Sequence, residues 1–249
     1  MKKDNLTTFP HGDMPGDKIE ISPQHIHKAG VIYPILKSMI RTEKTVICVC
    51  GGSGVGKSEI ASVLAGMLLK DGIGNYIMSG DNYSHRIPID NDAMREQVFR
   101  DGGREALSNY LGSSREIDFD LVNQILERFK AGTKTISMKR MGRTRDALWF
   151  DDVDMSHVQV LILEWTHGNS DYIQGVDVPI LLNSTPEETL EHRRKRNRDG
   201  GVDSPFTTMV LELEQQQLVR QAHKAKIIVA KSGNLMTYEK FCDLMGVSK

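Results

Sequence analysis

The chain has 249 residues, 39% of them hydrophobic and 26% charged, with a formal net charge of −1. These values are typical of a globular protein and argue against a chain-wide attraction to nucleic acid or to a membrane. No apolar run reaches the about 20 residues needed to span a bilayer, and the N-terminal segment has no apolar signal region. We therefore expect a cytoplasmic protein with reduced cysteines.

In chain order, apolar strands alternate with helices. Residues 1–24 are polar and contain Gly and Pro, which predicts a flexible or lapped N-terminal arm, and one domain is expected over 25–249. Continuous apolar strands separated by helices predict a doubly wound parallel sheet with helices on both faces. The expected strands are 45–50, 74–81, 158–165, 178–184 and 226–232, and the expected helices are 27–41, 58–72, 92–110, 118–130, 185–199 and 235–246.

A glycine loop, GGSGVGKS, follows the first predicted strand and matches G-x-x-x-x-G-K-[ST] in full. Its glycines let backbone N–H groups turn toward phosphate oxygens, and the following helix N-terminus favours negative charge. Lys57 would contact the β- and γ-phosphates, and the Ser58 hydroxyl would bind Mg²⁺. The loop therefore predicts a nucleoside triphosphate site. The expected nucleotide-binding residues are Gly51, Gly52, Ser53, Gly54, Val55, Gly56, Lys57, Ser58 and Glu59.

Other motifs narrow the class of P-loop protein. The sequence lacks the N-K-x-D guanine motif of GTP-binding switches and the L-S-G-G-Q signature of ABC ATPases. This leaves a small-molecule kinase as the first interpretation. An ATP-binding regulator that phosphorylates no metabolite stays open as the alternative. A nucleic-acid-binding ATPase is disfavoured by the near-neutral charge and the lack of aromatic residues among the basic clusters.

Two acids lie at the carboxyl ends of predicted strands. Asp81 ends the second strand, at the carboxyl end of the sheet, where doubly wound folds bind ligands. A carboxylate there can accept the proton of an acceptor hydroxyl or contribute to a Mg²⁺ site. Glu164 ends the apolar run VLILE, as expected of a strand whose terminal acid contacts Mg²⁺ through water. For Asp81, a turn or helix-cap role remains the alternative.

Two basic clusters come later in the chain. The segment EHRRKRNRDGG (191–201) predicts a small Arg-rich lid over about 193–206, in which Arg194 and Arg198 share one helix face and neutralise the transferred phosphoryl group. The alternative is a solvated helix face. The second cluster, Lys139 to Arg145, indicates an anionic acceptor, with a solvated hairpin as its alternative.

Taken together, these motifs resemble the uridine kinase/phosphoribulokinase family of P-loop kinases over about residues 44–232. The family's acid motif corresponds to Asp81-Asn82-Tyr83, its strand-end acid to Leu163-Glu164-Trp165, and its lid to RRKRNRD from Arg193. The resemblance implies ATP and Mg²⁺ as cofactors, Asp81 as catalytic base, Glu164 near the metal, and a P-loop kinase fold over residues 25–249.

The sequence also departs from this family. The stretch 138–146 lacks the Tyr, Phe and His with which uridine kinases hold their nucleoside, and Trp165 replaces the usual Gly. His85 and Arg86 are similar to a basic pair near the sugar phosphate in phosphoribulokinases. We expect a sugar phosphate or phosphorylated small acid first, and a sugar or nucleoside otherwise; a homo-oligomer is compatible with the sequence. The expected acceptor-side residues are Tyr83, His85, Arg86, Arg140, Arg143 and Arg145.

Overall fold

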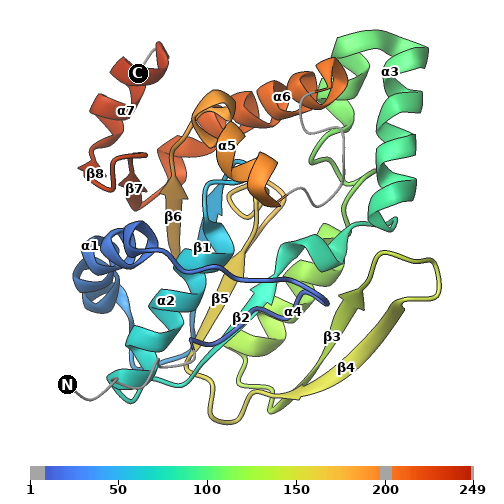
Figure 1. The fold of residues 1–249 in the computed structure, drawn as a ribbon. Coiled ribbons are helices and arrows are strands. Elements are labelled where there is room, and N and C mark those ends of the chain that lie inside the picture. Colours follow the sequence, from blue (N-terminus) through green and yellow to red (C-terminus); the bar gives the residue numbers. More distant parts are fainter. Residues whose placement is uncertain (1–8, 197–203, 248–249) are drawn as a thin grey trace.

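The computed structural model describes residues 9–196 and 204–247 and is built around a six-stranded sheet (Figure 1). The strands lie in the order β2-β5-β1-β6-β7-β8; the first five are parallel, and β8 is antiparallel to β7. Their bounds are Thr45–Gly51 (β1), Asn75–Ser79 (β2), Val160–Glu164 (β5), Val178–Leu182 (β6), Ile227–Val229 (β7) and Leu235–Met236 (β8).

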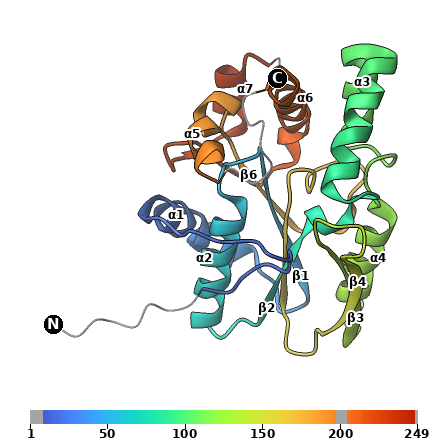
Figure 2. The ribbon, with the colours of Figure 1, turned by 45° about the vertical axis from the view of Figure 1, so that its right-hand side comes forward.

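Helices cover both faces of this sheet, as predicted (Figure 2). On one face, α1 (Pro23–Met39) and α2 (Lys57–Lys70) pack on Ile47 and Val49 of β1. On the other face, α4 (Phe119–Lys130), α6 (Pro205–Gln221) and α7 (Tyr238–Met245) contribute to a core that includes Cys48. Successive residues of β1 therefore face opposite cores, which explains why the strand is apolar throughout.

Two further helices and two short 3₁₀ turns complete the helical layer. Helix α3 (Pro88–Tyr110) packs against α6 through a small apolar cluster that includes Leu107 and Leu213. Helix α5 (Pro186–Arg196) follows β6. The turn η1 (Gly80–Tyr83) directly follows β2, and η2 (Ala222–Lys224) follows α6. In the described parts of the chain, no helix is both long and apolar enough to cross a membrane.

The main difference from the predicted elements is a separate antiparallel hairpin, β3 (Thr135–Met141) and β4 (Leu148–Asp154). The sequence pattern predicts no strand here, and a hairpin is only the alternative interpretation of the 139–145 cluster. Strand β3 carries Lys139 and Arg140 at buried positions, whereas β4 is almost wholly exposed. The polar–apolar alternation of β3 stops at Lys139-Arg140, and the three apolar residues that open β4 are followed by acids, so the strand signals are short in both.

The N-terminal segment 9–22 lies on the folded domain (Figure 1). The Ser62 hydroxyl in α2 donates a hydrogen bond to the carbonyl oxygen of Pro10. The Phe9 ring packs so closely on α2 that a Cβ at Gly66 would lie 2.8 Å from it. Further along, Asp13 reaches the carboxyl end of β2. The segment thus connects α2 with the edge strand of the sheet.

Candidate active site

The P-loop joins β1 to α2 and depends on glycine at specific positions. Gly54 and Gly56 have φ values of 77° and 95°, in the left-handed region that disfavours other residues. A Cβ at Gly51 would lie 2.6 Å from the carbonyl oxygen of Leu182. The loop therefore has the tight conformation that its glycines predicted.

The carboxyl ends of three adjacent strands bring the predicted metal ligands together. Strand β5 lies between β1 and β2, and Glu164 is in register with Ser79 of β2. The Ser58 hydroxyl donates to Glu164 Oε2 at 3.2 Å, and the Ser79 hydroxyl donates to Oε1 at 2.8 Å. Lys57 Nζ donates to the carbonyl oxygen of Gly52 at 3.2 Å. Lys57 and the side-chain oxygens of Ser58 and Glu164 thus lie next to the P-loop.

Glu164 is buried, and its protonation is affected by its surroundings. Burial, followed by the negative charge of Asp81, raises the pKa of Glu164 to about 7. Lys57 and the hydrogen bonds from Ser79 and Ser58 act in the opposite direction. Because this pKa lies near neutral pH, a nearby cation would be enough to favour the ionised carboxylate.

Asp81 lies in the turn η1, where its neighbours Gly80, Asn82 and Tyr83 are buried and it alone is exposed. The Trp165 side chain packs directly on Gly80. A rigid turn with one exposed carboxylate is the arrangement expected of a group that meets a substrate from solution.

These residues fit a nucleotide with Mg²⁺. The left-handed glycines shape a loop whose N–H groups can surround phosphate oxygens, and the Ser58 and Glu164 oxygens are the hard donors that Mg²⁺ prefers. When bound, the nucleotide would supply the phosphoryl group, and the ion would neutralise its charge.

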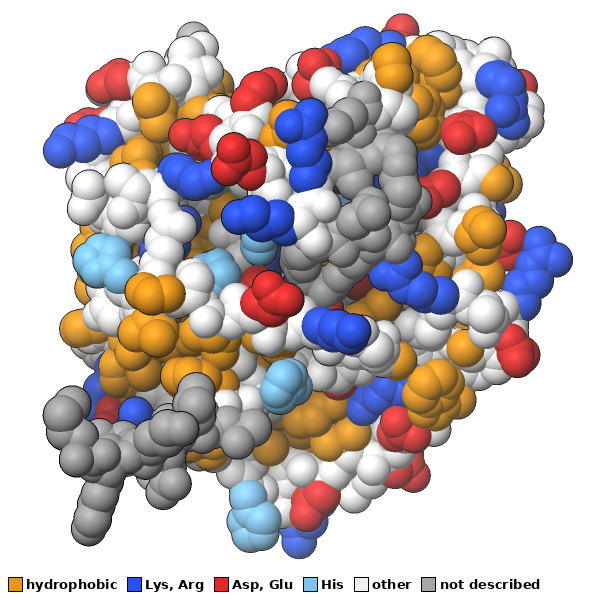
Figure 3. All heavy atoms as spheres, viewed as in Figure 1, with side chains coloured by type: hydrophobic (Ala, Val, Ile, Leu, Met, Phe, Trp, Pro, Cys, Tyr) orange, Lys and Arg blue, Asp and Glu red, His pale blue; other side chains and the backbone are white. Residues whose placement is uncertain are grey.

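Helix α5 lies against the P-loop. His192 Nδ1 is 2.7 Å from the carbonyl oxygen of Gly54, and a Cβ at Gly54 would lie 2.7 Å from Arg193 Cγ. Arg194, a predicted lid residue, is exposed. Arg198 and the rest of 197–203, half of the predicted lid, lie outside the described residues. Acidic and basic side chains are interspersed on the face of the molecule seen in Figure 3.

The predicted acceptor residues near η1 make contacts with the structure around it. Tyr83 is fully buried in the core. A ring nitrogen of His85 lies 3.0 Å from the carbonyl oxygen of Ser114. Arg86 donates to the Tyr110 hydroxyl at 3.1 Å and to the Arg115 carbonyl oxygen at 3.2 Å. These contacts tie the segment after η1 to the α3–α4 connection.

The hairpin arginines do not form one common surface. Arg140 is buried and pairs with Asp13 at 2.8 Å and with Asp151 at 3.2 Å. Arg143 is exposed in the β3–β4 connection. Arg145 is exposed and makes two hydrogen bonds to Asp90, at 3.1 and 2.9 Å. Arg140 is therefore buried in the structure, whereas Arg143 and Arg145 are exposed.

Sequence reasoning missed two residues that contact the site. Asp13 binds the backbone of Ser79, beside Glu164. His25 of α1 lies near the P-loop, because a Cβ at Gly56 would be 2.9 Å from its Nε2. Both precede the region of family resemblance and match no motif, so only their place in the fold reveals them.

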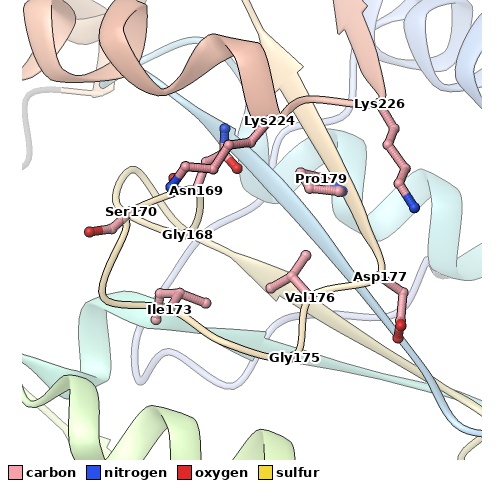
Figure 4. Close-up of a pocket in the computed structure, with 10 residues that line it drawn as sticks. All are labelled: Gly168, Asn169, Ser170, Ile173, Gly175, Val176, Asp177, Pro179, Lys224 and Lys226. Atoms are coloured by element: carbon pink, nitrogen blue, oxygen red, sulfur yellow. The ribbon is translucent and has the colours of Figure 1, made fainter.

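A pocket of about 250 Å³ lies away from these residues (Figure 4). Its lining includes Asp177 and Pro179 at the start of β6 and Lys226 just before β7. It is therefore near the amino ends of these strands, whereas the P-loop and Asp81 lie at carboxyl ends.

Comparison with known proteins gives a consistent result for the fold. No protein-family model matches the chain. Phosphoribulokinase from Rhodobacter spheroides has a TM-score of 0.58 at 14% identity, covering 76% of this chain and 71% of that one. A possible uridine kinase from Bacillus stearothermophilus has a TM-score of 0.55 at 15% identity, covering 81% and 96%. The chain has the P-loop kinase fold.

Two further proteins, one compared by structure and one by sequence, are also similar to this chain. D-glycerate 3-kinase from Cryptococcus neoformans has a TM-score of 0.53 at 12% identity, covering 87% of this chain and 98% of that one. The bifunctional alpha-galactosidase/sucrose kinase AgaSK from Mediterraneibacter gnavus is 45% identical over 192 residues, which is 77% of this chain. The match spans only 20% of that larger protein. The predicted resemblance to uridine kinases and phosphoribulokinases is thus confirmed at the level of the fold.

Proposed function

We propose that this protein transfers the γ-phosphoryl group of ATP to a hydroxyl group of a sugar. The observation that carries the proposal is the convergence of Lys57, Glu164 and Asp81 on the carboxyl ends of β1, β5 and β2. A protein that only binds ATP has no need for an exposed carboxylate at the acceptor side. AgaSK, which is named as a sucrose kinase, supports the same reaction class.

Each residue has a chemical role in this proposal. Asp81 accepts the proton of the acceptor hydroxyl as its oxygen bonds to the γ-phosphorus, and the bond to the β-phosphate oxygen breaks to release ADP. Lys57 interacts with the charge on the β- and γ-phosphates, while Ser58 and Glu164 provide the magnesium site. Arg194 and Arg198 are assigned to charge neutralisation from the lid.

Sucrose is the first acceptor to test, because AgaSK is named as a sucrose kinase. The environment of Arg140 favours a neutral sugar over an anion, since its charge is already compensated by Asp13 and Asp151. A sugar phosphate remains the second candidate, because Arg145 is exposed and its surface ion pair with Asp90 is weak enough to exchange.

The experiment is a screen of ADP release across neutral sugars, sugar phosphates and nucleosides. The proposal expects stimulation by a neutral sugar in the wild type and little in Lys57→Ala, with ATP and Mg²⁺ present in both. Stimulation only by sugar phosphates would show that the acceptor is a sugar phosphate and not a neutral sugar. ATP turnover that responds to none of these acceptors would favour the regulator.

A further inference from the structure

The N-terminal segment places one carboxylate in an unusually complete set of contacts at the acceptor side. Asp13 Oδ1 accepts from the backbone N–H of Ser79 at 2.7 Å and from Asn82 Nδ2 at 3.1 Å. Its Oδ2 accepts from the Tyr76 hydroxyl at 3.0 Å and from Arg140 at 2.8 Å. The Asp13 side chain is only 6% exposed.

This set of contacts leaves Asp13 little capacity for a ligand. A carboxylate offers about four lone-pair sites, and here four donors use them. Burial raises the pKa of Asp13, while the Ser79 N–H and the charge of Arg140 lower it. Because all four partners are donors, the group acts as an acceptor that holds other protein groups in place.

The groups it holds bracket Asp81. Ser79 lies two residues before Asp81, and its own hydroxyl binds Glu164. Asn82 follows Asp81 directly, and its Oδ1 accepts from the backbone N–H of Met141 in β3 at 3.0 Å. Asp13 therefore fixes the backbone before Asp81 and the side chain after it, and joins both to the hairpin.

We propose that Asp13 is a positioning residue for Asp81, and that the N-terminal segment 9–22 is part of the active site. The inference rests on the proposed function, in which Asp81 receives the acceptor proton. Small displacements of a catalytic group lower the rate steeply, so an anchor on both sides of Asp81 has a direct effect on turnover. Because its carboxylate oxygens accept from four protein donors, Asp13 acts through Asp81 and its neighbours.

The test is Asp13→Asn, compared with a matched variant. An Asn amide places an NH₂ group against one pair of donors, so either the Ser79 and Asn82 contacts or the Tyr76 and Arg140 contacts are lost. We expect kcat to fall about 10- to 100-fold, with the KM for ATP within about twofold of wild type. Hydrogen exchange of peptides covering 79–84 should become faster.

Asp177→Asn is the matched control. Asp177 also accepts from a strand backbone, the Val46 N–H at 2.9 Å, and pairs with a cation, Lys130 at 2.8 Å. It lies before β6, beside the pocket at the opposite strand ends. Its replacement should leave kcat and the exchange of 79–84 unchanged. Equal losses in both variants would reduce Asp13 to a general stabilising contact and overturn the proposal.

A double variant separates the positioning role of Asp13 from misfolding of the single variant. Asp13→Asn with Arg140→Gln removes both members of the buried ion pair and should fold while keeping the fast exchange and low kcat. Normal kcat and normal exchange at 79–84 in a folded Asp13 variant would refute the inference. The exchange measurement also works if no acceptor is found, so failure of the proposed function is distinguishable from failure of the positioning role.

Discussion

The indole of Trp165 occupies the space that a side chain at residue 80 would need. A Cβ built on Gly80 would lie 1.9 Å from Trp165 Cγ. Trp165 follows Glu164 and Gly80 precedes Asp81, so this contact packs together the backbones that carry the two acids of the site. A glycine at residue 80 is thus required by the tryptophan that replaces the glycine usual after the strand-end acid.

Gly80→Ala should therefore destabilise the protein. Overpacking in a dense site costs about 1–3 kcal/mol of unfolding free energy. Denaturant unfolding measures this cost, and in a Trp165→Ala background the same change should cost much less, because the obstructing ring is gone. Gly30→Ala, in helix α1 with open space at its Cβ, is the control and should be neutral or stabilising. An equal cost of Gly80→Ala in both backgrounds would contradict this packing.

The acid motif gives the second prediction. Asp81→Asn keeps the side-chain size but removes its basicity, so kcat should fall about 10²–10⁴-fold while ATP affinity stays nearly constant. Binding of ATP, measured by calorimetry, and kcat are needed in the same variant. If Asp81 were only a turn residue, Asn would replace it well and turnover would persist.

Much of this arrangement was predictable from local signals. The P-loop and Asp81 follow β1 and β2, and Glu164 ends the apolar strand β5. Parallel strands bring such positions to one edge of the sheet. The hairpin was not predictable, because its buried Lys139 and Arg140 depend on partners far away in sequence. Asp13 was missed for the same reason: its four donors lie within residues 76–82 and at Arg140, far from residue 13 in sequence, and only the fold brings them to it.

The hairpin arginines should differ in their effect on stability. Arg140→Met leaves the buried Asp13 without its cation, and breaking such a pair costs about 3–5 kcal/mol of unfolding free energy. Arg145→Met breaks an exposed pair in which the arginine side chain is 82% exposed, and should change stability little, because solvent screens such a pair. Thermal or denaturant unfolding compares them. If both substitutions lowered the free energy of unfolding by similar small amounts, the buried charge of Asp13 would not depend on pairing with Arg140.

Glu164 gives a prediction about pH. Because its pKa is raised to about 7, the folded protein holds this proton at pH values where the unfolded chain has lost it. Its contribution to the free energy of unfolding therefore falls as pH rises from about 4.5 to 7, by at most about 3 kcal/mol.

Glu164→Gln removes this titration. Without nucleotide and Mg²⁺, the variant should gain stability relative to wild type as pH rises from 4 to 8, as followed by denaturant unfolding at each pH. Other ionisable groups are shared by both proteins, so their contributions largely cancel in the difference. A difference between the two proteins that stays constant over this range would mean that Glu164 titrates normally.

The most direct test of phosphoryl transfer follows the phosphate itself. Wild-type protein, Mg²⁺ and ATP labelled at the γ-phosphate are incubated with sucrose, and the products are separated and identified by mass. We expect the label on a phosphorylated sugar in amounts that match the ADP formed, with Lys57→Ala giving little of it. Label that remains on ATP or appears only as inorganic phosphate, with every sugar, sugar phosphate and nucleoside supplied, would contradict the assignment of this protein as a small-molecule kinase.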